Sequence, residues 1–167
     1  MMAYSTDEIR ETLKRAMRGE KDGYSFYDLV SKRATNPDAK RLLEKLRDDE
    51  IRHMKVLQDI FKEMVGGDVG ELPEEGISAL TEVFKKGQVN ELQSEMEYLN
   101  LAIEAELAAT KYYQEFGKNV ENAEFKKVCE QLADEEHGHF EILQAEKDAL
   151  SGNYGWFSLG EGNPMEH

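Results

Sequence analysis

Two Glu-x-x-His motifs are the residues of this sequence best placed to do chemistry, Glu50 with His53 and Glu136 with His139. In a helix, residues three positions apart lie on the same face, one turn from each other. Carboxylate and imidazole together are ligands that suit iron or manganese, and zinc less selectively. One such motif on a charged helix is usually a solvated pair, but two at matching positions indicate a metal site.

The motifs lie on stripes that otherwise carry apolar residues at heptad spacing, and two further stripes carry Glu20 and Glu106. Buried carboxylates that lack partners cost several kcal/mol, and four at one level of a bundle would repel one another. Metal cations remove this cost, so the pattern predicts a site for two metal ions. The expected ligands are Glu20, Glu50, His53, Glu106, Glu136 and His139.

The two halves of the chain repeat, because residues 13–57 align without a gap on residues 99–143, 86 positions later. The alignment matches Glu20 with Glu106 and one Glu-x-x-His motif with the other. Glu104, the competing ligand on the third helix, aligns with Arg18 and points away from the apolar stripe. Each half is a helical hairpin, so we expect two hairpins related by a pseudo-two-fold axis.

Amphipathic periodicity predicts four long helices in residues 1–150, which suits an all-α, ferritin-like four-helix bundle. The 25-residue stretch between the second and third helices, with a short helix over 77–86, is long for a bundle. It suits a crossover, at about 66–88, that makes the third helix parallel to the second. The expected helices cover about 5–34, 37–65, 89 or 90 to 117, and 122–150; residues 151–167 form a tail.

Tyr27 and Tyr113 each follow a ligand glutamate by seven residues, on the same helix face. Either tyrosine could be an ordinary core residue with its hydroxyl satisfied, or a hydrogen-bond donor to a ligand carboxylate, and we favour the second reading. His137 lies on another face and is expected to be exposed. Cys129 reads as a small buried apolar residue.

The composition limits the possible partners. The chain has 167 residues, 40% of them hydrophobic, and a net charge of −14, which disfavours non-specific binding to nucleic acid. No apolar run is long enough to span a bilayer, and the N-terminus lacks the features of a signal peptide. With a single cysteine, these features lead us to expect a cytoplasmic protein.

At these motifs the sequence resembles the rubrerythrin family of the ferritin-like superfamily. The resemblance covers about residues 5–150 and rests on Gly19-Glu20, on residues 49–53 and 104–106, and on the string Ala-Asp-Glu-Glu-His-Gly-His at 133–139. It implies a non-haem di-iron oxidoreductase that reacts with hydrogen peroxide or dioxygen, often in defence against oxidative stress. It also implies a homodimer.

The sequence departs from that family in two ways. Ala109 stands where typical members carry an extra glutamate ligand, so we expect a symmetric site with six ligands. With only Cys129, no rubredoxin-like domain is expected, and electrons would come from a separate donor such as a rubredoxin. The alternative functions are a ferroxidase or other iron-handling protein, and a non-enzymatic, metal-stabilised scaffold or sensor.

Overall fold

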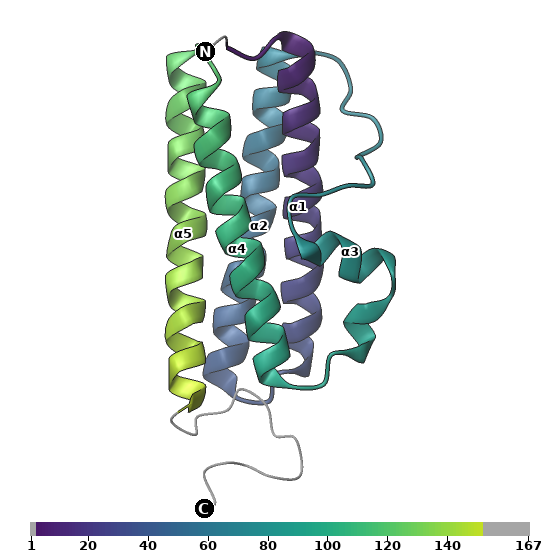
Figure 1. The fold of residues 1–167 in the computed structure, drawn as a ribbon, viewed down its shortest axis with the longest axis vertical. Coiled ribbons are helices and arrows are strands. Elements are labelled where there is room, and N and C mark those ends of the chain that lie inside the picture. Colours follow the sequence, from purple (N-terminus) through teal and green to yellow (C-terminus); the bar gives the residue numbers. More distant parts are fainter. Residues whose placement is uncertain (1–2, 152–167) are drawn as a thin grey trace, which may run out of the picture.

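The structure, a computed structural model, describes residues 3–151, and these form a bundle of four long helices (Figure 1). The long helices are α1 Thr6–Arg33, α2 Pro37–Met64, α4 Glu95–Lys118 and α5 Ala123–Ser151. The crossover between α2 and α4 contains the short helix α3 Ala79–Lys85 and a single 3-10 turn, η1, Gln88–Glu91. The tail expected at 151–167 lies outside the described residues, except for its first position.

The starts of α1 and α2 follow from their sequences. Ser5 and Glu8 form a capping box, in which each side chain accepts a hydrogen bond from the backbone of the other residue. The Asn36 side chain accepts hydrogen bonds from the backbone nitrogens of Asp38 and Ala39, and Pro37 occupies the first helical position. Both caps satisfy amide groups that have no partner within the helix.

The expected start of the third long helix near Val89 or Asn90 is wrong. Residues 88–91 form the separate turn η1, and α4 begins only at Glu95. Ser94 is the N-cap, and it forms a second capping box with Glu97. This box sets the start of the helix because it satisfies the first free amides of α4.

The crossover reverses the chain along the bundle, so that α4 runs parallel to α2, as expected (Figure 1). It packs on α1 through polar contacts. Arg15 donates a hydrogen bond to the backbone oxygen of Gly76 at 2.8 Å, and Arg18 donates one to that of Pro73 at 3.3 Å. The Thr81 hydroxyl donates to the buried Asp22. These contacts hold the crossover against the α1 side of the bundle.

The apolar core of the described residues forms two clusters, one on each side of the middle of the bundle. The first includes Leu13, Leu57 and Phe116, and the second includes Phe26, Leu46 and Leu99. The apolar stripes of all four long helices meet in these clusters. The polar residues between them therefore lie in a layer that apolar side chains cover at both ends, where charge is expensive unless it is compensated.

Candidate metal centre

The structure places all six expected ligands in that polar middle layer, and none has more than 4% of its surface exposed. Glutamates come from all four long helices, and the two histidines come from α2 and α5. In order along the chain they are Glu20 on α1, Glu50 and His53 on α2, Glu106 on α4, and Glu136 and His139 on α5.

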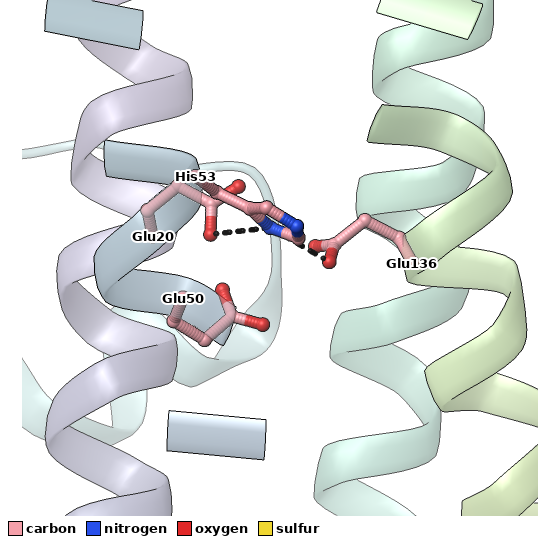
Figure 2. Close-up of side chains that lie close together, drawn as sticks. All are labelled: Glu20, Glu50, His53 and Glu136. Carbon is pink, nitrogen blue, oxygen red and sulfur yellow. Dashed lines mark ion pairs between the residues drawn. The ribbon is translucent and has the colours of Figure 1, made fainter. Parts of the chain in front are cut away.

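These residues form two groups whose possible ligand atoms lie within 4.8 Å of one another. One group adds Glu20 and His53 to the shared pair Glu50 and Glu136, and the other adds Glu106 and His139 to the same pair. Figure 2 shows the first group, with side chains from α1, α2 and α5 converging on one point. Two glutamates common to both groups are what bridging carboxylates between two ions require.

His53 points its Nδ1 atom into the site. This atom lies 3.2 Å from Glu136 Oε1 and 3.5 Å from Glu20 Oε2, the two ion pairs dashed in Figure 2. Burial opposes a charge on the ring, but the carboxylates of Glu136 and Glu20 outweigh it and raise the pKa of His53 to about 11. The imidazole therefore takes up a proton where a cation would otherwise compensate the carboxylates.

His139 has the corresponding place in the second group. Its Nδ1 atom lies 3.4 Å from Glu106 Oε1 and 3.5 Å from Glu136 Oε1. Burial again opposes the charge, and contact with Glu106 and Glu136 raises the pKa of His139 to about 9. The two histidines thus respond to their surroundings in the same direction.

The shared glutamates carry the electrostatic cost of the site. Burial and the charges of Glu136 and Glu20 raise the pKa of Glu50 well above its usual value. Burial and the charge of Glu106 do the same to the pKa of Glu136. Burial also acts on Glu20, but hydrogen bonds from its neighbours outweigh it and lower the pKa of that carboxyl. Four carboxyl groups in one buried layer thus demand positive charge, from protons or from metal ions.

Several atoms that face the centre of the site have no hydrogen-bond partner among the described residues, although they are fully buried. They include Glu20 Oε2, Glu50 Oε1, Glu106 Oε2, Glu136 Oε1 and the Nδ1 atoms of both histidines. Buried polar atoms without partners are rare, and an ion is one of the few explanations for a converging group of them. Oxygen and imidazole donors in this number fit two iron or manganese ions.

Tyr27 and Tyr113 donate hydrogen bonds to ligand carboxylates, and they do so across the two hairpins. The Tyr27 hydroxyl on α1 donates to Glu106 Oε1 on α4 at 2.5 Å. The Tyr113 hydroxyl on α4 donates to Glu20 Oε1 on α1, also at 2.5 Å. Burial, followed by the charge of the bonded glutamate, raises both tyrosine pKa values well above the ordinary value, so both hydroxyls keep their protons.

Asp49 and Glu135 are functional candidates that the sequence reasoning missed. Each precedes a shared glutamate, and each faces the outward nitrogen of the histidine on the opposite helix. Asp49 Oδ2 lies 2.9 Å from His139 Nε2, and Glu135 Oε2 lies 3.3 Å from His53 Nε2. Such carboxylates orient a ligating histidine and increase its basicity. The sequence contained a signal for this pair, because Asp49 and Glu135 occupy corresponding positions of the 86-residue repeat and both are acidic.

The rejected candidates lie outside the cluster. Glu104 is exposed on α4. The side chain of His137 is half exposed and pairs with Glu141 on its own helix at 2.9 Å. Ala109 is buried, borders the same pocket as the four glutamates, and offers no donor atom. Cys129 is buried in the first apolar cluster, where burial raises its pKa to about 12.

A four-helix bundle with one long crossover, two glutamates and two Glu-x-x-His motifs facing inward is the known arrangement of ferritin-like di-iron carboxylate proteins. The fold and the site place this chain in that class. A family model described as Rubrerythrin matches residues 11–91 and 97–159. The chain therefore belongs to the rubrerythrin family, and its buried carboxylate and histidine cluster fits a di-iron protein.

Solved structures share the fold at low sequence identity. A hypothetical protein from Pyrococcus furiosus is 24% identical, with a TM-score of 0.73 over 90% of this chain and 92% of that one. A protein from Thermotoga maritima described as ferritin-like and diiron-carboxylate is 22% identical, with a TM-score of 0.65 over 89% and 97%. CopM in its Cu(II)-bound form is 13% identical, with a TM-score of 0.71 over 89% and 99%. The comparison with curated proteins finds no match.

Among the described residues, no helix combines the length and the low charge that a membrane span needs.

Proposed function

We propose that this protein is a non-haem di-iron oxidoreductase that reduces hydrogen peroxide, with dioxygen as a second oxidant. The observation that carries the proposal is the pair of ligand groups that share Glu50 and Glu136. Glu20 and His53 would complete the site of one ion, and Glu106 and His139 the site of the other. When bound, two ferrous ions supply the two electrons that, with two protons, convert one hydrogen peroxide to two waters.

The residues of the chain hold this site in a fixed geometry. Tyr113 holds Glu20 Oε1 and leaves Oε2 of that residue beside His53, and Tyr27 holds Glu106 Oε1, which also lies beside His139. The apolar clusters at both ends limit access of water. Electrostatic effects at the site are stronger in such a dry layer than in water. Repeated turnover requires an electron donor, for which we propose a separate small iron protein such as a rubredoxin.

The test is single-turnover oxidation. Metal-free protein is loaded anaerobically with about two ferrous ions per chain, the number the ligand groups suggest, and is mixed with hydrogen peroxide. We expect oxidation faster than that of free ferrous iron, with absorption typical of an oxo-bridged ferric pair. The variant Glu106→Ala should lose this reaction, whereas Glu104→Ala, an exposed glutamate two residues away, should keep it. Wild-type oxidation no faster than free iron would contradict the proposal.

A ferroxidase is the second candidate, and the observation that favours it is Ala109. The resemblance to the rubrerythrin family implies an additional glutamate ligand at this position. Here the two ligand groups have the same composition, with three glutamates and one histidine each. A ferroxidase would oxidise iron with dioxygen and release it, without a reducing partner. Retention of both irons through repeated cycles with peroxide and a chemical reductant favours the oxidoreductase, and their release after each oxidation favours the ferroxidase.

A further inference from the structure

A small pocket lies beside the candidate metal centre, between α1, α4 and the crossover. It offers about 20 Å³ to water-sized molecules, enough for one water. Glu50, Glu106 and Glu136 reach it from three helices, and Ile77 of the crossover borders it. The pocket is therefore the space from which a small molecule would meet the centre of the site on this side.

The pocket has a polar inner end. The buried carboxyl groups of Glu50, Glu106 and Glu136 line this end. The opposite side of the site, between α2 and α5, is occupied by the contacts of the two histidines with Asp49 and Glu135. An oxidant therefore has room beside these carboxyl groups on the α1 and α4 side, and much less room on the histidine side.

The outer wall of the pocket is fixed where the crossover lies on α1. A Cβ atom at Gly19 would come within 2.8 Å of Ile77 Cδ1, so the isoleucine fills the place of a missing side chain. The adjoining residue Gly76 is held by Arg15, and Thr81 is held by Asp22. At the inner end, a Cβ atom at Gly23 would lie 3.0 Å from Glu50 Oε2. The free space is thus set by two glycines and one isoleucine.

We propose that Ile77 is a specificity-determining residue that restricts the oxidant to hydrogen peroxide and dioxygen, with two heavy atoms each, and excludes organic hydroperoxides. The inference rests on the proposed function and adds its substrate class. Reduction of an organic hydroperoxide needs the same two electrons and two protons and breaks the same O–O bond, giving an alcohol and one water. The difference between the two oxidants is therefore one of size at the pocket, and the electron count is the same.

The kinetic test compares two oxidants in the anaerobically iron-loaded protein. The wild type should oxidise its iron with hydrogen peroxide and much more slowly with cumene hydroperoxide. Ile77→Ala should raise the ratio of the cumene hydroperoxide rate to the hydrogen peroxide rate by at least about tenfold, the effect of pocket volume on discrimination. Ile77→Val should give a smaller rise, and it serves if the alanine variant fails to fold.

The matched control is Leu72→Ala, which also shortens an apolar side chain of the crossover. Leu72 packs on the first apolar cluster and does not border the pocket. Its substitution should leave the ratio unchanged. A ratio that rises equally in the Leu72 and Ile77 variants would show that general loosening of the crossover admits the larger oxidant, and would overturn the assignment to Ile77.

A second readout uses the metal-free protein and does not depend on any reaction. Crystals of wild type, Ile77→Ala and Leu72→Ala are pressurised with xenon, which occupies apolar space of sufficient size. We expect xenon at this pocket only in the Ile77 variant. Xenon at this pocket in the wild type, or no xenon there in the Ile77 variant, would show that Ile77 does not limit the size of the pocket. If the wild type reacts with neither oxidant while xenon follows this pattern, the proposed function is wrong, but Ile77 still limits the size of the pocket.

Discussion

The α1–α2 and α4–α5 hairpins supply the same ligands, and they differ most at the residues just outside them. On α2, Arg52 contacts both Glu135 and Asp49, the carboxylates that face the histidines. The corresponding residue of α5 is Gly138, where an added Cβ atom would meet no other group within 4 Å. A single guanidinium therefore lies beside both carboxylates. The two hairpins carry the same residues at the candidate metal centre. They differ at Arg52 and Gly138, because only Arg52 contacts a carboxylate of the other hairpin.

The crossover produces a second difference. Gly19 of α1 corresponds to Ala105 of α4 in the repeat, and a Cβ atom at Gly19 would lie only 2.8 Å from Ile77 of the crossover. Glycine occurs where another segment approaches too closely for a Cβ atom. Gly23 and Ala109 correspond in the same way, and both border the pocket. The pocket side of the site thus has small residues in both hairpins, and the crossover lies over both.

The largest effect should come from removing a shared ligand. Glu50→Gln and Glu136→Gln should each abolish binding of both ions, because both residues belong to both ligand groups. Glu20→Gln and Glu106→Gln should each remove one ion and leave about one of two. Elemental analysis of iron per chain, with Glu104→Gln as control, measures this. Different losses from Glu50→Gln and Glu136→Gln would break the equivalence of the hairpins.

Glu50→Gln should act in the opposite direction on the stability of the metal-free protein. The pKa of Glu50 is raised in the folded state, so a charged Glu50 carboxylate destabilises the native protein at neutral pH unless it takes up a proton. A neutral glutamine removes that cost, and the metal-free Glu50→Gln protein should melt at a higher temperature than metal-free wild type. A lower melting temperature would contradict this account of the charges.

The next largest effect should come from the carboxylates behind the histidines. Asp49→Asn and Glu135→Gln should lower metal affinity by about 10- to 100-fold, because each weakens the support of a ligating histidine. The loss should be larger for Asp49→Asn, since its contact with His139 is shorter, 2.9 Å against 3.3 Å for Glu135 and His53. Competition with a metal-binding dye measures both affinities. A larger loss in Glu135→Gln would reverse the ranking.

The two tyrosine variants should give effects on stability that are equal to each other. Tyr27→Phe and Tyr113→Phe each remove one hydrogen bond to a buried carboxylate, at a cost of roughly 1–3 kcal/mol. Because the two bonds have the same length, their losses in the free energy of unfolding should agree. Urea denaturation measures this. Tyr112→Phe is a suitable control, since its hydroxyl donates to a backbone oxygen of α1 away from the ligands.

Arg52 should have the smallest effect on stability, although it is the clearest difference between the hairpins. Its side chain is half exposed, and exposed ion pairs contribute about 0.2–1 kcal/mol. Arg52→Gln should therefore change the free energy of unfolding by less than the tyrosine variants do. A loss as large as that of Tyr27→Phe would show that the guanidinium acts on the buried site through Asp49 and Glu135.

Much of this arrangement could be predicted from the sequence, because it depends on periodicity and repetition. The heptad positions of Glu50 and His53 determine which helix face they occupy, and the repeat determines that Glu106 joins them while Glu104 stays exposed. The capping pair Ser5 and Glu8 marks the start of α1 as expected. Helix faces and helix caps depend on residues that lie close together in the sequence, so they can be predicted from it.

Other features were not predictable because they depend on how the helices meet. The sequence suggested that the tyrosines bond to ligands, but it did not indicate that each would choose the glutamate of the opposite hairpin. It also did not indicate that Glu50 and Glu136, of the four glutamates, would be the shared pair. The contact of Ile77 with Gly19 depends on the path of the crossover, which has little periodicity of its own.

The crossed tyrosine bonds have a consequence for how such a centre can be assembled. One hairpin alone contains every residue type that the site uses: a glutamate, a tyrosine seven residues later, and a Glu-x-x-His motif. It lacks only a second hairpin to receive its tyrosine bond. Two identical hairpins about a two-fold axis would satisfy one another, since Tyr27 of each copy would face Glu20 of the other. The centre thus has the symmetry of a dimer within one chain, and the crossover links the two hairpins covalently, so the second half of the site does not have to be recruited from another molecule.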